Sequence, residues 1–240
     1  MASVSSPVIL FVLAGGILPA IFWLWFWLKE DPHPEPSGII LLTFLAGAFS
    51  VLLVFPLQRI AAGILASGFL LIFIWAGIEE LMKLVAAYFS TLHRKALNEP
   101  IDYMMYMIST ALGFAAFENA LFILKSLNED GVAASLVTLA MRFVGAMLVH
   151  VLASSLLSGI YALAFCKNRF WKIMHIILGL TVATGLHAIF NFYIINATNT
   201  LIVFVVLWVG IVALLLFFEK IKHLVCVLPY RLKRGRKVTA

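Results

Sequence analysis

Long apolar runs alternate with short polar stretches along most of the chain. A membrane-crossing helix needs about 20 mostly apolar residues. The runs that meet this length are Val8–Leu28, Ile39–Pro56, Ile64–Phe89, Ile101–Leu124, Phe143–Phe165, Ile173–Ile195 and Leu201–Phe218. The third run is long, and we expect its start around Gln58–Ala66 to be tilted or interfacial. The pattern predicts an all-α polytopic integral membrane protein, a bundle of seven transmembrane helices.

A shorter apolar segment, Val132–Arg142, falls below the length of a span. We expect it to lie at the membrane interface or to re-enter, and the count becomes eight spans if it crosses. A β-structure is excluded because open sheet edges cannot face lipid, and the short alternating segments of a barrel are not seen. We predict one transmembrane domain over residues 1–223, which contains an intramembrane polar site, followed by a basic cytosolic tail over 224–240.

The composition supports a membrane protein and argues against a nucleic-acid partner. The chain is 64% apolar and 12% charged, with a mean hydropathy of +1.09, whereas soluble domains are about 45–50% apolar and about 25% charged. The net charge is +6, but seven of the 17 bases lie in the tail from Lys220 to Lys237, where they suit an anionic lipid leaflet. The lipid bilayer is thus the expected partner, and the oligomeric state is left open.

Lysine and arginine are unequally divided between alternate loops, which predicts the orientation. One set of loops holds Lys29, Arg94, Lys95, Lys167, Arg169, Lys172 and the seven bases of the tail. The other set holds Arg59, Lys125 and Arg142. Because cytosolic loops carry the excess of bases, we expect the N-terminus outside and the C-terminus in the cytosol of the plasma (inner) membrane.

Several ionisable residues fall inside the apolar spans, where a charge costs on the order of 2.5–3.5 kcal/mol. They are Glu79, Glu80, Lys83, Glu118, His150 and His187. Either glutamate of the third span is within helical reach of Lys83, at four and three residues. His150 lies four residues before Ser154, and His187 four residues before Asn191. Polar pairs from four spans would therefore project inward around a hydrated cavity.

Each of these residues also has a purely structural interpretation. A lone intramembrane histidine is often a helix–helix hydrogen-bond partner, and Lys83 would neutralise one glutamate. Two adjacent carboxylates beside one cation are harder to explain in this way. The second must keep its proton or bind a cation, because burial and a like charge both disfavour ionisation. The combined set points to acid–base chemistry or to a cation site.

The known protease motifs narrow the chemistry. The chain contains no H-E-x-x-H sequence, which excludes a zincin-like site, and no Gly-x-Ser-x-Gly serine elbow. Asp31, Asp102 and Asp130 lie in loops or at span ends, which argues against an aspartyl dyad. What remains is glutamate chemistry supported by histidine and asparagine, with or without a metal.

Five short motifs together resemble the PrsW family of intramembrane proteases, which is related to the CAAX prenyl endopeptidases and bacteriocin-immunity-type membrane proteases. They are Glu79-Glu80-Leu-Met-Lys83, Glu99-Pro-Ile-Asp102, Gly113-Phe-Ala-Ala-Phe-Glu-Asn119, His150-x-x-x-Ser154 and His187-x-x-x-Asn191. The acidic, proline-rich loop Lys29–Pro36 is also similar to that of the family. The resemblance extends from about Lys29 to Asn191.

The resemblance implies roles for these residues. Glu79 would activate water, supported by Glu80 with Lys83 as counterion, while His150, His187 and Asn191 would orient the water or stabilise the oxyanion. Glu118 stands where CAAX-type enzymes have histidine, so it would be a metal ligand, a second acid or a structural partner. Asn119 and Ser154 would support the set. The implied substrate is a single-pass membrane protein of the anti-sigma-factor type.

Two questions stay open from the sequence. Glu80, Glu118, His150 and His187 would suit a divalent metal such as zinc in ligand type, but the same set works equally without one. The chain could also be a proton- or cation-coupled transporter, since buried Glu, Lys and His residues form proton relays, although no Gly/Pro-broken repeats of the transporter kind are evident. A non-catalytic membrane scaffold with the same fold is the other alternative.

Overall fold

The computed structural model describes residues 6–92, 97–196 and 200–224, and this part of the chain is almost entirely helical. The helices are α1 (Ser6–Leu28), α2 (Ser37–Ile64), α3 (Phe69–Ala87), α4 (Pro100–Glu129), α5 (Gly131–Met141), α6 (Met147–Ala162), α7 (Arg169–Ile195) and α8 (Thr200–Lys222). A π-helical turn η1 (Tyr88–Leu92) extends α3, and a second one, η2 (Arg142–Ala146), joins α5 to α6. The predicted all-α polytopic fold is confirmed.

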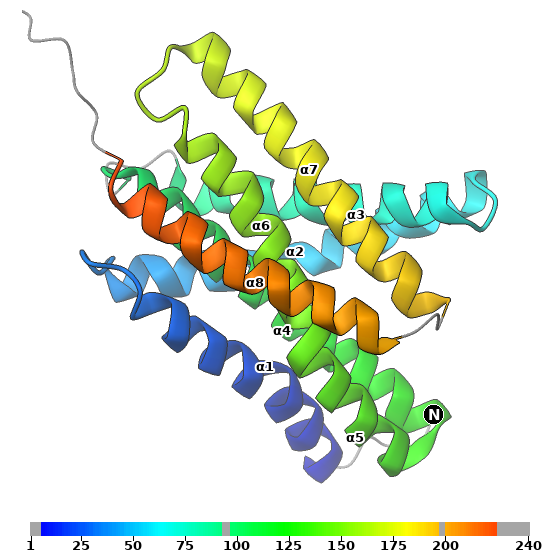
Figure 1. The fold of residues 1–240 in the computed structure, drawn as a ribbon. Coiled ribbons are helices and arrows are strands. Elements are labelled where there is room, and N and C mark those ends of the chain that lie inside the picture. Colours follow the sequence, from blue (N-terminus) through cyan, green and yellow to red (C-terminus); the bar gives the residue numbers. More distant parts are fainter. Residues whose placement is uncertain (1–5, 93–96, 197–199, 225–240) are drawn as a thin grey trace, which may run out of the picture.

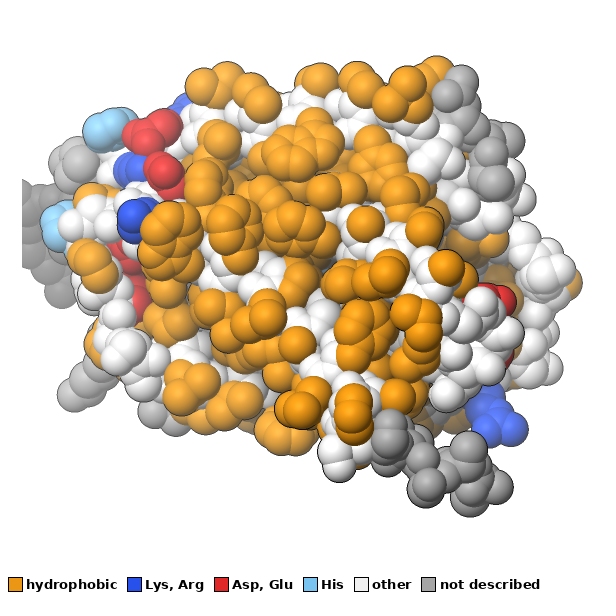
Figure 2. Space-filling model, turned by 90° about the horizontal axis from the view of Figure 1, so that it is seen from below, with side chains coloured by type: hydrophobic (Ala, Val, Ile, Leu, Met, Phe, Trp, Pro, Cys, Tyr) orange, Lys and Arg blue, Asp and Glu red, His pale blue; other side chains and the backbone are white. Residues whose placement is uncertain are grey.

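Six of these helical segments are long and apolar enough to cross a membrane, with α5, η2 and α6 counted as one helix, Gly131–Ala162. The seventh, α3, has 19 residues, about 28 Å at 1.5 Å per residue. It is less apolar because it contains Glu79, Glu80 and Lys83. Figure 2 shows the resulting surface: apolar side chains cover the middle of this face, and charged side chains gather at two opposite edges.

Two sequence-based boundaries are wrong. The stretch from Gln58 to Ile64 continues α2 through Pro56, and α3 begins only at Phe69. The segment Val132–Arg142 is not an eighth span, because α5 runs through η2 into α6 as one helix, Gly131–Ala162. In lipid the backbone has no water to bond to, so a helix tends to continue past a proline or an irregular turn.

The helices run between two ends of the molecule (Figure 1). The α1–α2 and α6–α7 connections, residues 29–36 and 163–168, lie at one end, which we call the basic end. The α2–α3 and α4–α5 connections lie at the opposite end. The α2–α3 connection includes Gly68 with φ +146°, a left-handed backbone conformation that favours glycine. The basic tail predicted for 224–240 falls outside the described residues beyond Leu224.

Helix α4 is the most buried span and lies between the others. It packs closely on α2 through small residues: a Cβ added at Gly113 would overlap the Phe44 carbonyl, and one at Gly47 would overlap the Thr110 carbonyl. Small residues at such crossings let helix backbones approach in membranes. Helices α4 and α6 thus form the centre of the bundle.

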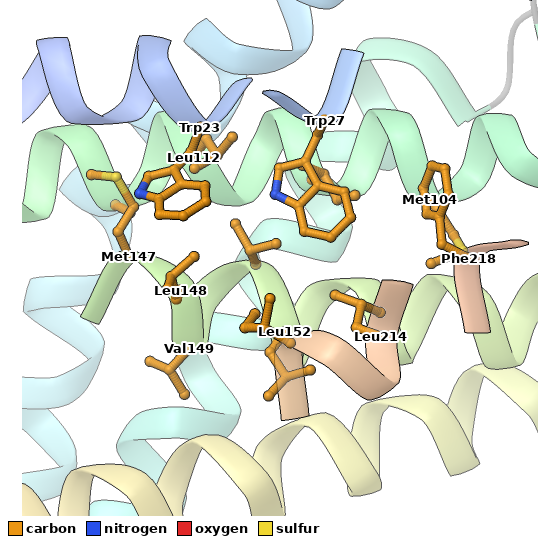
Figure 3. Packing of buried hydrophobic residues seen from close by; sticks show 14 of the residues in the cluster. Trp23, Trp27, Met104, Leu112, Met147, Leu148, Val149, Leu152, Leu214 and Phe218 are labelled. Carbon is orange, nitrogen blue, oxygen red and sulfur yellow. The ribbon is translucent and has the colours of Figure 1, made fainter. Parts of the chain in front are cut away.

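Apolar side chains from α1, α4, α6 and α8 fill one side of this centre. Figure 3 shows Trp27 lying among residues that include Leu148, Leu152 and Leu214. Trp27 and Phe218 rings pack against each other with centroids 5.7 Å apart. We call this cluster the apolar half. On the other side, between α3, α4, α6 and α7, lie the polar residues of the spans.

Candidate functional site

The adjacent glutamates of α3 lie in different surroundings, although both are buried. Glu80 is surrounded by donors: Lys83 Nζ at 2.5 Å and His187 Nδ1 at 2.8 Å contact its Oε1, and Ser154 Oγ donates to Oε2 at 3.0 Å. Three elements, α3, α6 and α7, therefore hold one carboxylate. Such a charge-assisted network fixes the geometry of every group in it.

Only one of the two carboxylate oxygens of Glu79 has a hydrogen-bond partner among the described residues. Gln58 Nε2 donates to its Oε1 at 2.7 Å. Its Oε2 is buried and has no hydrogen-bond partner among the described residues, and the nearest histidine atom is His187 Nε2 at 3.6 Å. A buried polar atom without a partner costs free energy, so a native structure usually keeps one for a ligand, a water or a functional role. Glu79 Oε2 is therefore the atom of this site most in need of a partner.

The two imidazoles lie edge to face, with ring centroids 4.8 Å apart and an angle of 87° between the ring planes. His150 Nδ1 lies 2.8 Å from Lys83 Nζ, and its Nε2 lies 3.1 Å from Glu118 Oε2. Because an ammonium only donates, we assign the proton of a neutral His150 ring to Nε2, from which it is donated to Glu118. His187 differs, since Glu80 binds its Nδ1 and leaves Nε2 directed at Glu79.

Arg142 joins the site through the π-helical turn η2. Its guanidinium donates to Glu118 Oε2 and, from Nε at 2.5 Å, to Asn119 Oδ1. Eight residues of α-helix turn through about 800°, which would separate Arg142 and His150 by about 80° around the axis. A π turn takes up one extra residue, so the two side chains are arranged as if seven apart, about 20° from alignment. Both can therefore contact Glu118.

The charges of the site do not balance within the protein. Three carboxylates, Glu79, Glu80 and Glu118, lie beside the two fixed cations Lys83 and Arg142. One negative charge is left for a proton or a bound cation. It belongs most naturally to Glu79, because Glu80 has Lys83 and Glu118 has Arg142. A buried charge without a partner is strongly disfavoured, so the site is built to take up a positive species.

The structure brings most of the predicted site residues into one cluster. These are Glu79, Glu80, Lys83, Glu118, Asn119, His150, Ser154 and His187. Asn191 is different: it is partly exposed, one turn beyond His187, and its side chain makes no hydrogen bond with the described residues. Gln58 and Arg142 also belong to the site, although the sequence did not predict them there. Both fall in the two segments whose boundaries the sequence pattern placed wrongly, although an arginine eight residues before His150 was a visible signal.

Glu79, His150 and His187 are the residues that could hold a metal, since each offers a ligand atom and these atoms lie within 4.8 Å of one another. The unpartnered Glu79 Oε2 and the uncompensated negative charge fit a divalent cation, and two histidines with one glutamate is a ligand set of catalytic zinc. Both ring nitrogens of His150 have partners, Lys83 Nζ at Nδ1 and Glu118 Oε2 at Nε2, so His150 would have to give up one of them to bind the ion. The predicted ligand set was Glu80, Glu118, His150 and His187. In the structure both oxygens of Glu80 have other partners, and Glu118 Oε2 contacts Arg142 and His150.

Comparison with known proteins shows which family the chain resembles. Over residues 35–217 the chain matches the model described as PrsW family intramembrane metalloprotease. It is 36% identical over 132 residues to a protein named Protease PrsW from Geobacillus kaustophilus, covering 52% of this chain and 57% of that protein. A Protease PrsW from Bacillus subtilis is 28% identical over 199 residues, which cover 78% of this chain and 84% of the relative.

Other matches agree with these two. A Protease PrsW from Halalkalibacterium halodurans is 34% identical over 122 residues, or 48% of this chain and 55% of that protein. The match thus spans little more than half the length of the Geobacillus and Halalkalibacterium relatives. No solved structure matches the chain with comparable significance. Because the family model covers well over half of the sequence, this chain belongs to the PrsW family of intramembrane metalloproteases.

Proposed function

We propose that this protein hydrolyses a peptide bond of a membrane-spanning protein at the site around Glu79. The observation that carries the proposal is the contrast between the two adjacent glutamates. Both oxygens of Glu80 accept hydrogen bonds. Glu79 Oε2, in contrast, is buried, has no hydrogen bond with the described residues and lies toward the His187 ring. A carboxylate held in this state can orient a water molecule and take up its proton, as a general base must.

The neighbours of Glu79 have supporting roles. Glu80 binds His187 Nδ1 and so directs the other nitrogen of the ring at Glu79. Lys83 compensates the negative charge of Glu80, and Arg142 that of Glu118, which reduces the repulsion between the carboxylates of the site. Asn191, one turn beyond His187, is free to donate its amide to the substrate carbonyl, where an oxyanion-hole donor is worth about 2.7–4 kcal/mol.

A metal fits the same residues. Glu79, His150 and His187 would hold it, with Glu80 behind His187 as the outer partner that sets the orientation of the ring. A bound zinc ion would supply Lewis-acid polarisation of the carbonyl and a more acidic water. The negative charge left over in the site would then be compensated by the ion.

The substrate and the orientation are also parts of the proposal. By the resemblance of its motifs, the substrate is a single-pass protein of the anti-sigma-factor type in the plasma membrane. The basic end carries Lys29, Lys167, Arg169, Lys172, Lys220 and Lys222, against Arg59 and Lys125 near the opposite end. This bias favours a cytosolic basic end, with the N-terminus outside and Glu79 within the bilayer.

Cleavage in a defined membrane tests the proposal. Purified wild type and Glu79→Gln are reconstituted with single-pass anti-sigma-factor-type substrates, with and without a chelator. We expect product from wild type and inhibition by the chelator. Glu79→Gln should give about 100- to 10,000-fold less product, because a working acid–base group contributes on the order of 10²–10⁴ in rate. Equal cleavage by both proteins would refute the role of Glu79.

Two other outcomes would replace the protease by another function. Proton or cation flux into the same liposomes without cleavage would support a transporter. A stable, stoichiometric complex with the substrate and no product would support a scaffold. Cleavage that persists in the chelator but is lost in Glu79→Gln would support a protease that works without a metal.

A further inference from the structure

We propose that Gln58 is a positioning residue that holds Glu79 in its working orientation. Its amide fixes Glu79 Oε1 at 2.7 Å, which leaves Oε2 as the oxygen that faces His187 Nε2 at 3.6 Å. A carboxylate with neither oxygen held would rotate, because its terminal torsion is broad. The inference deepens the proposed function and rests on it, since it adds a residue to the same site.

Gln58 reaches the site from a loosely packed part of α2. No residue from Phe55 to Leu70 is buried, whereas Val54 and Val51, one turn and two turns before Gln58, are in the core. We call the segment from Pro56 to Ile64 the α2 arm. At its base Pro56 cannot donate the backbone hydrogen bond to residue 52. The arm is therefore held in place by few contacts with the rest of the protein.

Two hydrogen bonds attach this arm to α3 at one residue. The Gln58 side chain donates to Glu79, and the Gln58 backbone carbonyl accepts from Trp75 Nε1 at 3.0 Å. Trp75 lies one turn before Glu79 on α3. The Trp75 indole therefore holds the main chain of Gln58, and the Glu79 carboxylate holds its side chain. An exposed segment without buried residues gains little from packing, so a polar contact of this geometry points to a role at Glu79.

The arrangement matches how ligands and bases are held in enzymes. A group that binds the far oxygen of a carboxylate fixes the direction of the near one, and loss of such an outer partner typically costs 10–100-fold in metal affinity or activity. Gln58 cannot change its charge, so it orients Glu79 without compensating the negative charge that the site needs. Methionine is close to glutamine in size and lacks the amide donor, so Gln58→Met removes the hydrogen bond and little else.

The test measures zinc affinity and cleavage kinetics on the same full-length, untagged proteins. Zinc binding is measured in detergent by competition with a chromogenic chelator, and kcat and KM in the proteoliposome assay. We expect Gln58→Met to bind zinc about 10-fold more weakly and to lose about 10-fold in kcat, with KM and melting temperature close to wild type. Arg59→Met is the matched control: Arg59 is exposed and makes no hydrogen bond with described residues, so both values should stay unchanged.

The outcomes separate this inference from the proposed function. Wild-type zinc affinity and wild-type kcat in Gln58→Met would overturn the role of Gln58 while leaving the protease in place. A wild type that cleaves without zinc would still support the inference if Gln58→Met lowered kcat alone. A wild type that neither binds zinc nor cleaves would refute the proposed function, and the inference would fall with it.

Discussion

The two sides of the α4–α6 centre are equally buried, but one consists of apolar side chains and the other of polar and charged ones. In the apolar half, Trp27, Leu148 and Phe218 are at most 1% exposed, and in the polar half Glu80, Lys83 and Ser154 are 0% exposed. Apolar side chains need only shape and volume to pack, whereas each buried ionic group needs a specific partner. The same degree of burial therefore gives a tolerant core on one side and an interdependent network on the other.

The polar half should depend more strongly on single residues. Lys83→Met would leave Glu80 buried without its cation and His150 without its donor. Breaking a buried pair by removing one partner costs about 3–5 kcal/mol of folding free energy, so we expect a large loss of folded protein from this change. The yield of monodisperse protein and its melting temperature in detergent measure it, and a yield and melting temperature equal to wild type would contradict the network.

A substitution in the apolar half should lower the stability of the protein without changing its kcat. Trp27→Ala removes a fully buried ring that packs on Phe218, and large-to-alanine changes in cores cost about 3–5 kcal/mol. We expect a lower melting temperature but an unchanged kcat for the protein that remains folded. A change in kcat at equal folded concentration would show that the two halves are coupled.

The π-helical turn is the point where the polar half depends on backbone geometry. Arg142→Met keeps the turn but leaves Glu118 without its cation, and Arg142→Lys keeps the charge but loses the contact of Nε with Asn119. Because both side chains of the pair are partly exposed, at 15% and 13%, we expect a smaller loss of stability, about 1–3 kcal/mol for Met and less for Lys. Denaturant unfolding of both variants tests the order.

The smallest expected effect lies outside both halves, in the 29–36 connection. Burial raises the pKa of Glu35 from 4.5 to about 7, with repulsion from Asp102 and Asp31 adding to it and the Tyr106 hydroxyl, which donates to Glu35, opposing it. The folded protein therefore holds this proton more tightly than the unfolded chain between these values. Stability should fall as the pH rises from about 4.5 to 7 and then level off.

Glu35→Gln isolates this effect. The variant should lose that part of the pH dependence and melt a few degrees above wild type at pH 8, with little difference at pH 5. Melting curves of both proteins across this range measure the difference. A constant difference at all pH values would show that Glu35 does not titrate in this window.

The sequence predicts contacts between residues of the same helix, but not contacts between helices that are distant in the chain. The spacing of Glu80 and Lys83 predicts their contact, and the charges in apolar spans predict a shared cavity. The spacing allowed Lys83 to pair with either glutamate, and only contacts from other helices, Gln58 and His187, separate their roles. Those contacts depend on packing between segments distant in the chain.

Two errors had the same physical origin. The pattern of apolar residues placed the end of the second span at Pro56 and set the segment 132–142 apart from the span that follows it. In this bundle α2 continues past Pro56 and carries Gln58 to the site, and η2 turns Arg142 toward Glu118. Irregular helical turns are hard to see in a sequence, because the pattern of apolar residues continues through them.

The most direct test of the account compares Glu79→Gln and Glu80→Gln in one experiment, with cleavage and melting temperature measured on the same proteoliposome preparations. The account predicts that Glu79→Gln abolishes cleavage and leaves the melting temperature unchanged or higher, because its Oε2 has no hydrogen bond to lose. Glu80→Gln should lower the melting temperature strongly, because Lys83 loses its counter-charge and one of the two oxygens that accept from Lys83, Ser154 and His187 becomes an NH2 donor. Cleavage by Glu79→Gln at the wild-type rate, or equal stability losses in the two variants, would contradict it.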